Sequence, residues 1–325
     1  MDFTFTPEQE DLREQARAFL AEHPQASWRE LADLGWTGVS ISEEDGGAGL
    51  SFLEEAVLFE ELGRALHHGP YFSTIALALP ALPDDLRSEV AAGETRWTLA
   101  LGPLVTDLDT ADRIAMVGGD GIYELEGADR ELLQTSDETR PLGVLRGGEP
   151  GLRLSDSGVL EEIRRRALAA LALEACGVAR RALEYALEYV TTREQFGKTI
   201  GVYQAISHPL ADSYMRLELA RSLSLWAAWC VAEDDEQAPV AAAAAKAYAA
   251  EAAVGVCEAA IQAHGGIGFT WEHELHRLYK RALWIESFLA SGTRLRADIA
   301  ATLLDGASTS GSSASPVPVS VTEGG

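Results

Sequence analysis

The sequence has few cysteines, few basic residues and no long apolar run, and each shortage excludes a class of protein. Its three cysteines, Cys176, Cys230 and Cys257, lack metal-ligand spacing and are odd in number, so we expect buried thiols in a reducing, cytoplasmic compartment. The 26 basic and 51 acidic residues give a formal net charge of −25, which repels nucleic-acid phosphates and anionic membrane surfaces. No stretch reaches about 18 uninterrupted apolar residues, and no basic segment precedes an apolar run at the N-terminus. We therefore expect neither a membrane span nor an export signal.

Apolar, helix-forming sequence is abundant, and its pattern divides the chain. Hydrophobic residues make up 47% of the 325 residues, which is enough for a large core in one or two domains. Helical periodicity runs through residues 1–94, short strand-like runs broken by Gly and Asp follow in 95–157, and long helical segments return in 158–305. We predict a mostly α fold with an N-terminal helical domain, a reduced β middle domain and a C-terminal helical bundle. The Ser-, Pro- and Gly-rich tail at 306–325 is predicted to be disordered.

Two arginine-bearing segments are suited to phosphate ligands. In TTREQFGKTIGVYQAISH, Arg193, Gln195 and Phe196 stand where one long helix stops, and Gln204 lies within the segment that follows. A guanidinium offers a planar fork of donors that fits a phosphate. An ordinary turn between helices fits the same residues, so this segment alone leaves both interpretations open. The three arginines at 164–166 either meet CoA phosphates or form a solvated helix face.

A second segment, IQAHGGIGFTWEHELHRLYKRA, places glycines directly after an alanine-rich helix. Gly265 and Gly266 end that helix, and Gly268 follows. Adjacent glycines form a C-cap and also let bare backbone approach a ligand closely, whereas a cap alone explains only the first glycine. The three histidines of this segment lack the i, i+4 pairing with an acid that helical zinc sites use, so no metal site is predicted.

Taken together and in this order, these segments resemble those of the acyl-CoA dehydrogenase family. The resemblance extends from Phe3 to about Leu304 and includes SEEDGGAGL in place of the family's PExxGGxG loop. It implies the three-domain fold with a C-terminal four-helix bundle, and FAD as cofactor. In that family the RxxFG and QxxGGxG segments reach across a dimer interface to the pyrophosphate and adenine half of FAD. Carried over by matching position, the FAD contacts are Arg193, Gln195, Phe196, Gln204, Gln262, Gly265 and Gly266.

The middle domain departs from the family pattern. Family members carry a TEPxxGSD turn that touches flavin and substrate, whereas here Leu101, Gly102 and Pro103 run into acidic residues. Only about 60 residues separate Thr95 from Ser155, roughly half of what a full middle domain with its longer strands occupies. We therefore expect that this chain does not cradle an isoalloxazine ring by itself.

The two family positions of the catalytic base hold apolar residues. The chemistry needs a carboxylate that takes the α-proton while the β-hydrogen leaves as hydride to the flavin. Without gaps, the family's YEGT glutamate falls at Leu289, and the alternative position, 26 residues before Arg193, is Ala167. Glu286 lies one helical turn before Leu289 and is the candidate for a relocated base. The competing interpretation is a solvated or structural glutamate, so the catalytic residue stays unknown.

Retained cofactor motifs beside missing flavin-ring and base elements predict the smaller subunit of a two-gene enzyme. The resemblance is to short subunits of actinobacterial α2β2 heterotetramers, which dehydrogenate bulky CoA thioesters such as steroid side-chain fragments. We expect an acyl-CoA substrate, a larger acyl-CoA dehydrogenase subunit as partner and an electron-transfer flavoprotein as acceptor. Three alternatives stay open: a self-sufficient homo-oligomeric dehydrogenase with a displaced base, a non-catalytic scaffold derived from the family, and a flavin-dependent oxidase or nitroalkane-type enzyme of the same fold.

Overall fold

The structure, a computed structural model, describes residues 5–304 and divides into two compact units, each discontinuous in sequence. The part called here the helical unit consists of the described chain up to Gln25, Phe52–His67 and Leu168–Ala301. The part called the mixed unit consists of Ala26–Ser51, His68–Ala167 and residues 302–304. The mostly helical fold with a small β region is confirmed, while the bounds of the predicted domains stay predictions. The predicted tail at 306–325 lies outside the described residues.

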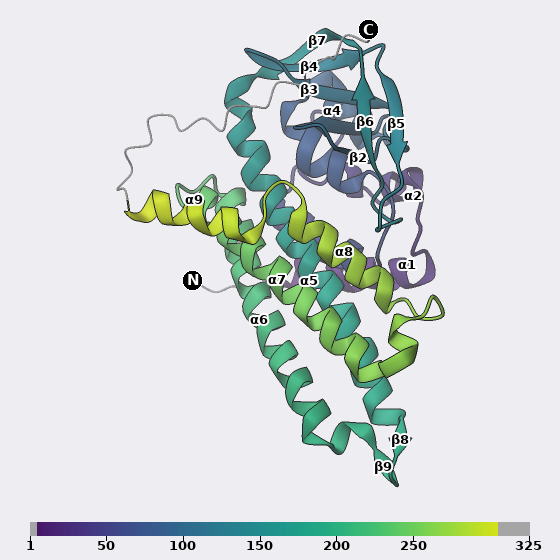
Figure 1. Cartoon of the computed structure of the whole chain (residues 1–325). Coiled ribbons are helices and arrows are strands. Elements are labelled where there is room, and N and C mark those ends of the chain that lie inside the picture. The colour runs from purple at the N-terminus through teal and green to yellow at the C-terminus, as the bar shows by residue number, and fades with distance from the viewer. Residues whose placement is uncertain (1–4, 305–325) are drawn as a thin grey trace, which may run out of the picture. The chain divides into compact units, whose positions relative to one another are not determined.

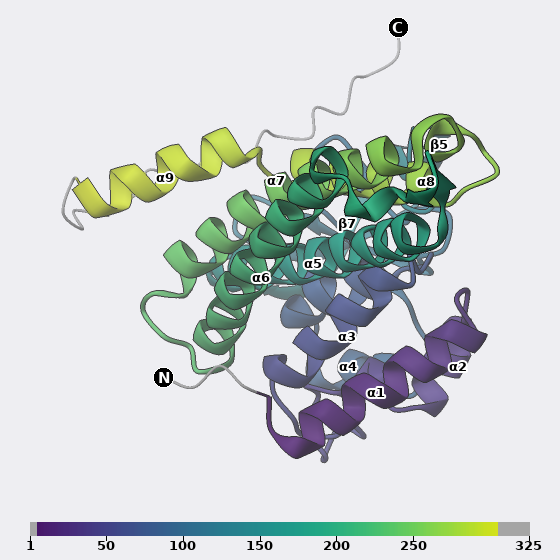
Figure 2. The same cartoon turned by 90° about the horizontal axis from the view of Figure 1, so that it is seen from below.

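The helical unit is built from long helices that lie side by side (Figures 1 and 2). Its helices are α1 (Pro7–Glu22), α3 (Phe52–Arg64), α5 (Leu160–Thr192, in this unit from Leu168), α6 (Gln204–Ala232), α7 (Ala238–His264), α8 (Leu275–Ser287) and α9 (Gly292–Leu304, in this unit to Ala301). Its short elements are β8 (Glu194–Gln195), β9 (Lys198–Thr199) and the 3-10 turns η5 (Ile200–Val202) and η6 (Gly265–Phe269). The predicted long C-terminal helices correspond to α5, α6 and α7.

Small residues let these helices approach closely. A Cβ built on Gly177 of α5 would lie 1.9 Å from the carbonyl oxygen of Glu60 in α3, and one on Gly63 would lie 2.4 Å from that of Glu174. The backbones of α3 and α5 are therefore in direct contact, with no room for a methyl group. Most buried positions of α7 are alanines, which explains how this helix sits in the core of the unit.

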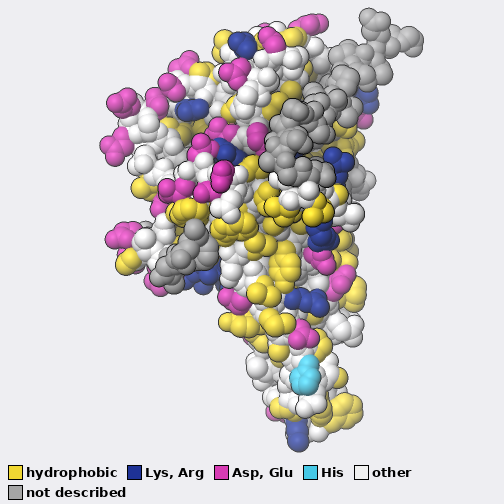
Figure 3. Space-filling model, turned by 90° about the vertical axis from the view of Figure 1, so that its left-hand side faces the viewer, with side chains coloured by type: hydrophobic (Ala, Val, Ile, Leu, Met, Phe, Trp, Pro, Cys, Tyr) yellow, Lys and Arg dark blue, Asp and Glu magenta, His cyan; other side chains and the backbone are white. Residues whose placement is uncertain are grey.

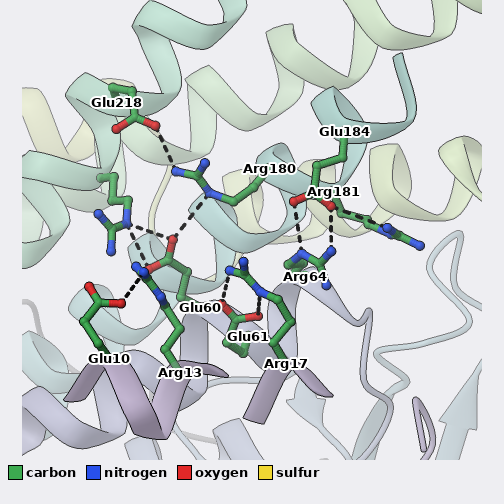
Figure 4. A network of polar contacts seen from close by, with 11 residues as sticks. Glu10, Arg13, Arg17, Glu60, Glu61, Arg64, Arg180, Arg181, Glu184 and Glu218 are labelled. Atoms are coloured by element: carbon green, nitrogen blue, oxygen red, sulfur yellow. Dashed lines mark hydrogen bonds and ion pairs between the residues drawn. The ribbon is translucent and has the colours of Figure 1, made fainter. Parts of the chain in front are cut away.

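Buried ion pairs fix α3 among its neighbours in the helical unit (Figure 4). Glu60 and Glu61 on α3 are 2% and 1% exposed. Arg221 Nε of α6 lies 3.0 Å from Glu60 Oε1, and Arg180 Nε of α5 lies 3.8 Å from the same oxygen. Arg17 of α1 pairs with Glu61 at 2.6 Å. Because a carboxylate buried without a partner is costly, these pairs favour a single register of α3 against α1, α5 and α6.

The mixed unit combines short helices with two small sheets. Its helical elements are α2 (Trp28–Asp33), η1 (Trp36–Gly38), the π-helix η2 (Phe72–Ala78), η3 (Leu79–Ala81), α4 (Asp84–Ala91), η4 (Ser157–Val159) and the first turns of α5. Its strands are β1 (Trp97–Ala100), β2 (Val105–Thr106), β3 (Arg113–Val117), β4 (Gly121–Glu126), β5 (Asp129–Leu133), β6 (Leu142–Arg146) and β7 (Glu149–Asp156). One sheet has the order β1-β3-β4-β7 with β1 and β3 parallel, and the other is antiparallel with the order β2-β6-β5.

The edge strand β1 is covered by the π-helix. Thr74 Oγ1 of η2 donates to the carbonyl oxygen of Trp97 at 2.8 Å and accepts from its N–H at 3.0 Å. These bonds satisfy backbone groups that an open sheet edge would leave exposed. The apolar core beside this edge includes Ala100, Val105 and Ile114. The edge of the four-stranded sheet at Trp97 is therefore bonded to the π-helix.

One segment of the described chain, Ala238–Phe269, is long and apolar enough to cross a membrane by length and composition. Of its most apolar window, 67% is buried inside the structure. Packing against neighbouring helices accounts for this apolar sequence, so length and composition are weak evidence for a span.

Candidate cofactor-binding site

The first predicted segment forms a tight hairpin at the end of α5. In the β8–β9 pair, Gln195 lies opposite Lys198, and Phe196 and Gly197 make the two-residue turn with φ of 54° and 77°. Positive φ at both turn residues matches the twist of a hairpin, but it is strained for phenylalanine. Phe196 is 92% exposed. The turn therefore projects an aromatic side chain out of the helical unit.

The predicted polar contacts of this segment are exposed. Arg193 directly follows α5, where its N–H donates to the carbonyl oxygen of Tyr189 at 2.8 Å, and its side chain is exposed. Gln195 donates from Nε2 to the neighbouring carbonyl of Glu194 at 2.8 Å, and Gln204 is the exposed first residue of α6. An exposed guanidinium, with its planar fork of donors, suits an anionic group.

The three glycines of the second predicted segment have different structural roles. Gly265 has φ of 63°, which favours glycine, and its N–H caps α7 by donating to the carbonyl oxygens of Gln262 and Ile261. A Cβ on Gly265 or Gly266 would meet nothing within 4 Å, so their surface is open to a ligand. A Cβ on Gly268 would lie 2.8 Å from the carbonyl oxygen of Ile261, so this glycine serves packing. The side chain of Gln262 is exposed.

A cluster of four rings joins the two segments, and the sequence analysis did not predict it. Tyr189 of α5 stacks on His264 with centroids 4.4 Å apart, and His264 lies 4.6 Å from His273. Tyr185, one turn before Tyr189, meets His273 edge-on at 5.1 Å. We call these four residues the ring cluster. The spacing of Tyr185 and Tyr189, i and i+4 directly ahead of Arg193, was the available signal.

The ring cluster places the hairpin and the glycine segment at the same end of the helical unit, as Figure 1 also shows. Tyr189 both stacks on His264, which precedes Gly265, and accepts the N–H of Arg193. The structure therefore places the two predicted segments at one end of this unit, and the individual FAD contacts stay predictions. The open glycine surface and the exposed guanidinium fit the pyrophosphate and adenine end of FAD.

An apolar groove of about 550 Å³ runs beside the hairpin. It is lined by Leu187, Val190, Thr191, Thr199, Gly201, Val202, Ser207, Leu210, Ala211 and Tyr214. Further along α6, Met215 and Leu219 are each 55% exposed. Figure 3 shows hydrophobic side chains interspersed with charged ones on the face that it draws, most densely around its middle.

The positions of the family base are apolar in the structure as in the sequence. Leu289 lies in the turn after α8 with φ of 61° and is 37% exposed. Lys246 of α7 holds this turn, since its Nζ donates to the carbonyl oxygen of Glu286 at 2.8 Å and to that of Ala290. Ala167 is fully buried. Glu286 is half-buried, and its role as a base stays a prediction.

Both interpretations of the arginines at 164–166 are wrong for Arg166. Its guanidinium is buried in the mixed unit, where it donates to the carbonyl oxygen of Ile75 at 3.1 Å and to Ser40 Oγ at 3.0 Å. Arg166 therefore stabilises the unit and faces neither solvent nor a CoA phosphate. Within residues 5–304, no group of three or more His, Cys, Asp or Glu is arranged to hold a metal ion.

Comparison with known proteins identifies related sequences at both ends of the described chain. Residues 6–81 match the acyl-CoA dehydrogenase N-terminal domain, and residues 164–304 match the acyl-CoA dehydrogenase C-terminal domain. Acyl-CoA dehydrogenase IpdE2 of Mycobacterium tuberculosis is 34% identical over 267 residues, which cover 80% of this chain and 81% of that protein. Acyl-CoA dehydrogenase FadE34 of the same organism is 36% identical over 286 residues, which cover 81% of this chain and 40% of that protein.

Solved structures share the fold over nearly the whole chain. A variant of the Tcur3481-Tcur3483 steroid ACAD superimposes with a TM-score of 0.83 at 28% identity, covering 92% of this chain and 98% of that one. The ChsE4-ChsE5 complex from Mycobacterium tuberculosis gives a TM-score of 0.82 at 25% identity, covering 93% of this chain and 99% of that one.

Proposed function

The chain belongs to the acyl-CoA dehydrogenase family, and from that premise we propose that it is an FAD-dependent subunit whose active site needs a larger partner. The reaction would introduce an α,β double bond into a CoA thioester. One contrast carries the proposal: the cofactor-side residues Arg193, Gly265 and Gly266 are exposed and open, whereas the base positions are Leu289 and Ala167. Neither an alanine nor a leucine takes a proton, so the base belongs to the partner.

This chain's own residues would hold the adenine and pyrophosphate end of FAD. Arg193 would meet the pyrophosphate, because its guanidinium is exposed directly beyond α5. Gly265 and Gly266 would let the backbone approach the dinucleotide, since no atom lies within 4 Å of either built Cβ. Gln195, Phe196, Gln204 and Gln262 would complete the surface. FAD supplies the hydride acceptor for the β-carbon when it is bound.

Similar proteins support the substrate and the assembly that we propose. The two similar solved structures are a steroid ACAD and the ChsE4-ChsE5 complex. FadE34 matches this chain over only 40% of its own length, so the homologous sequence there is part of a longer protein. We propose a bulky CoA thioester such as a steroid side chain, an α2β2 heterotetramer, an electron-transfer flavoprotein as acceptor and a cytoplasmic location.

Flavin content tests the assembly. The chain is expressed alone and with a larger acyl-CoA dehydrogenase subunit encoded beside it, and flavin per chain is measured by absorbance. We expect flavin only in the complex, at about one per two chains. Stoichiometric flavin in the chain alone would support the self-sufficient enzyme, and Glu286→Gln would then test its base. Absence of flavin in both preparations would favour the non-catalytic scaffold. Oxygen consumption with acyl-CoA would identify an oxidase.

Arg193→Ala tests the cofactor contact within the complex. Loss of a charged hydrogen bond to a phosphate is expected to weaken FAD binding about 10- to 100-fold. Arg29→Ala is the matched control, because Arg29 is an exposed arginine of the mixed unit that pairs with Asp33. FAD affinity is measured by titrating the cofactor-free complex and following flavin fluorescence. Equal affinities in the two variants would remove Arg193 from the site.

A further inference from the structure

Two histidine rings, one at each end of the segment between α7 and α8, contact each other. His264 begins this segment and His273 lies near its end, and their centroids are 4.6 Å apart. Between them lies η6, with Gly265 and Gly266. Two tyrosines of α5 contact these histidine rings: Tyr189 stacks on His264, and Tyr185 meets His273 edge-on. The position of the glycines against the end of α5 therefore depends on these two contacts.

The two histidines differ in whether Nδ1 carries a proton, because one Nδ1 faces a backbone carbonyl and the other faces a backbone N–H. His264 Nδ1 lies 2.8 Å from the carbonyl oxygen of Ala260, so this nitrogen carries a proton and donates. That bond survives in the charged ring. His273 Nδ1 accepts the N–H of Leu275 at 3.2 Å, so this nitrogen must be free of a proton. A proton added to His273 Nδ1 breaks the bond.

The surroundings of His273 oppose its positive charge. Leu275 is the first residue of α8, so a charged His273 would stand at the positive end of that helix. Burial lowers the pKa of His273, and the neighbouring His264 and His276 lower it further, while Glu274 raises it. On the side of α5, the Tyr185 hydroxyl donates to Glu274 Oε2 at 2.5 Å and accepts from Arg181 at 2.9 Å. The carboxylate of the adjacent residue Glu274 is thus already engaged.

We propose that neutral His273 is a positioning residue that locks the glycine segment to the end of α5, and that a proton on His273 Nδ1 releases this segment and weakens cofactor binding. The proposal rests on the proposed FAD contact of Gly265 and Gly266. Because the folded protein favours the neutral ring, the contribution of His273 is complete above the ordinary histidine pKa of about 6.5. It is lost as the pH falls below that value through the lowered pKa of the folded state.

Two substitutions separate the protonation step from simple packing. In His273→Asn the side-chain oxygen takes the place of Nδ1 as acceptor for the Leu275 N–H, and it does not titrate. In His273→Phe the ring contacts are kept but the acceptor is lost. Between pH 7.5 and 5.5 we expect the FAD affinity of the wild-type complex to fall progressively, toward a limit of about tenfold once His273 is fully charged, as for one lost hydrogen bond. His273→Asn should hold its affinity over that range, and His273→Phe should bind weakly at both pH values.

The control is His23→Asn, because His23 is exposed at the end of α1. The FAD affinity of this variant should depend on pH as that of the wild type does. If His273→Asn follows the wild-type pH curve, the proposal fails. Amide hydrogen exchange of residues 264–275 in the cofactor-free complex, corrected for intrinsic rates, tests the lock without FAD. Protection of the Leu275 amide should fall on acidification in the wild type and stay constant in His273→Asn. If exchange behaves this way but FAD binds at no pH, the lock stands and the proposed cofactor role fails.

Discussion

The contact between α3 and α5 gives a sharp prediction, because two backbones meet there without side chains. A Cβ on Gly177 would lie 1.9 Å from the carbonyl oxygen of Glu60 and 2.7 Å from the backbone nitrogen of Arg64. Neither atom belongs to a flexible side chain that rotates away. Gly177→Ala must therefore push the two helices apart or bend one of them.

Two opposing effects set the size of the change. Alanine in place of glycine within a helix stabilises by about 1 kcal/mol. Overpacking a tight core costs about 1–3 kcal/mol, and the cost is at its upper end where backbone must move. Separation of α3 from α5 also strains the buried pair between Arg180 and Glu60, whose atoms lie 3.8 Å apart. We expect a net loss of about 1–2 kcal/mol in the free energy of unfolding.

Gly255→Ala is the matched control, since Gly255 also lies within a long helix of the helical unit. A Cβ there would meet only Arg216 Nη1, at 3.3 Å, and that side-chain end is flexible. This variant should gain about 1 kcal/mol from helix propensity alone. Urea unfolding followed by circular dichroism measures both midpoints, with an unchanged slope as the check of a two-state comparison. If Gly177→Ala proves as stable as Gly255→Ala, the backbones of α3 and α5 do not touch.

Two further substitutions probe buried charges of the helical unit. Arg281 and Glu174 form a buried ion pair, and Arg281→Met removes the guanidinium from it. The free energy of unfolding, measured by urea unfolding, should fall by about 3–5 kcal/mol. Adding Glu174→Leu should recover most of this loss, and an equally unstable double variant would contradict the assignment. Burial lowers the pKa of Lys246 from 10.5 to about 8. Between these values the unfolded chain binds more protons, so stability from this group should rise with pH, and Lys246→Met should lack that rise when unfolding is compared at pH 7.5 and 10.

The helices that position the site could be predicted from sequence because their signals are local. Alanine-rich periodicity marks α5, α6 and α7, and paired glycines mark the end of α7. The strand β5 could not be found in the same way, because all five of its residues are exposed and show no alternation of apolar and polar side chains. The π-helix η2 depends on bonds to the distant strand β1, which no local pattern reveals.

Contacts between distant residues explain what sequence reasoning missed in the site. Tyr189 and His264 are far apart in the chain, and only the packing of α5 against α7 makes their rings stack. Arg166 was interpreted by the charge of its neighbours, yet its partners, Ile75 and Ser40, come from other parts of the mixed unit. A charged residue in a basic run is buried when the fold supplies acceptors, and sequence alone does not show them.

The turn at Leu289, one of the two predicted base positions, is held in a strained conformation by other residues of the helical unit. A left-handed backbone costs a leucine about 1–2 kcal/mol, so other contacts must maintain φ of 61° there. Lys246 supplies them by binding the carbonyl oxygens on both sides of Leu289, and Trp284 stacks on Phe288 with centroids 4.4 Å apart. A leucine in this turn cannot transfer a proton, yet the fold holds it partly exposed in a strained conformation. We therefore expect the turn to shape a surface that meets an acyl group or a partner, as the proposal of a base supplied by another subunit requires.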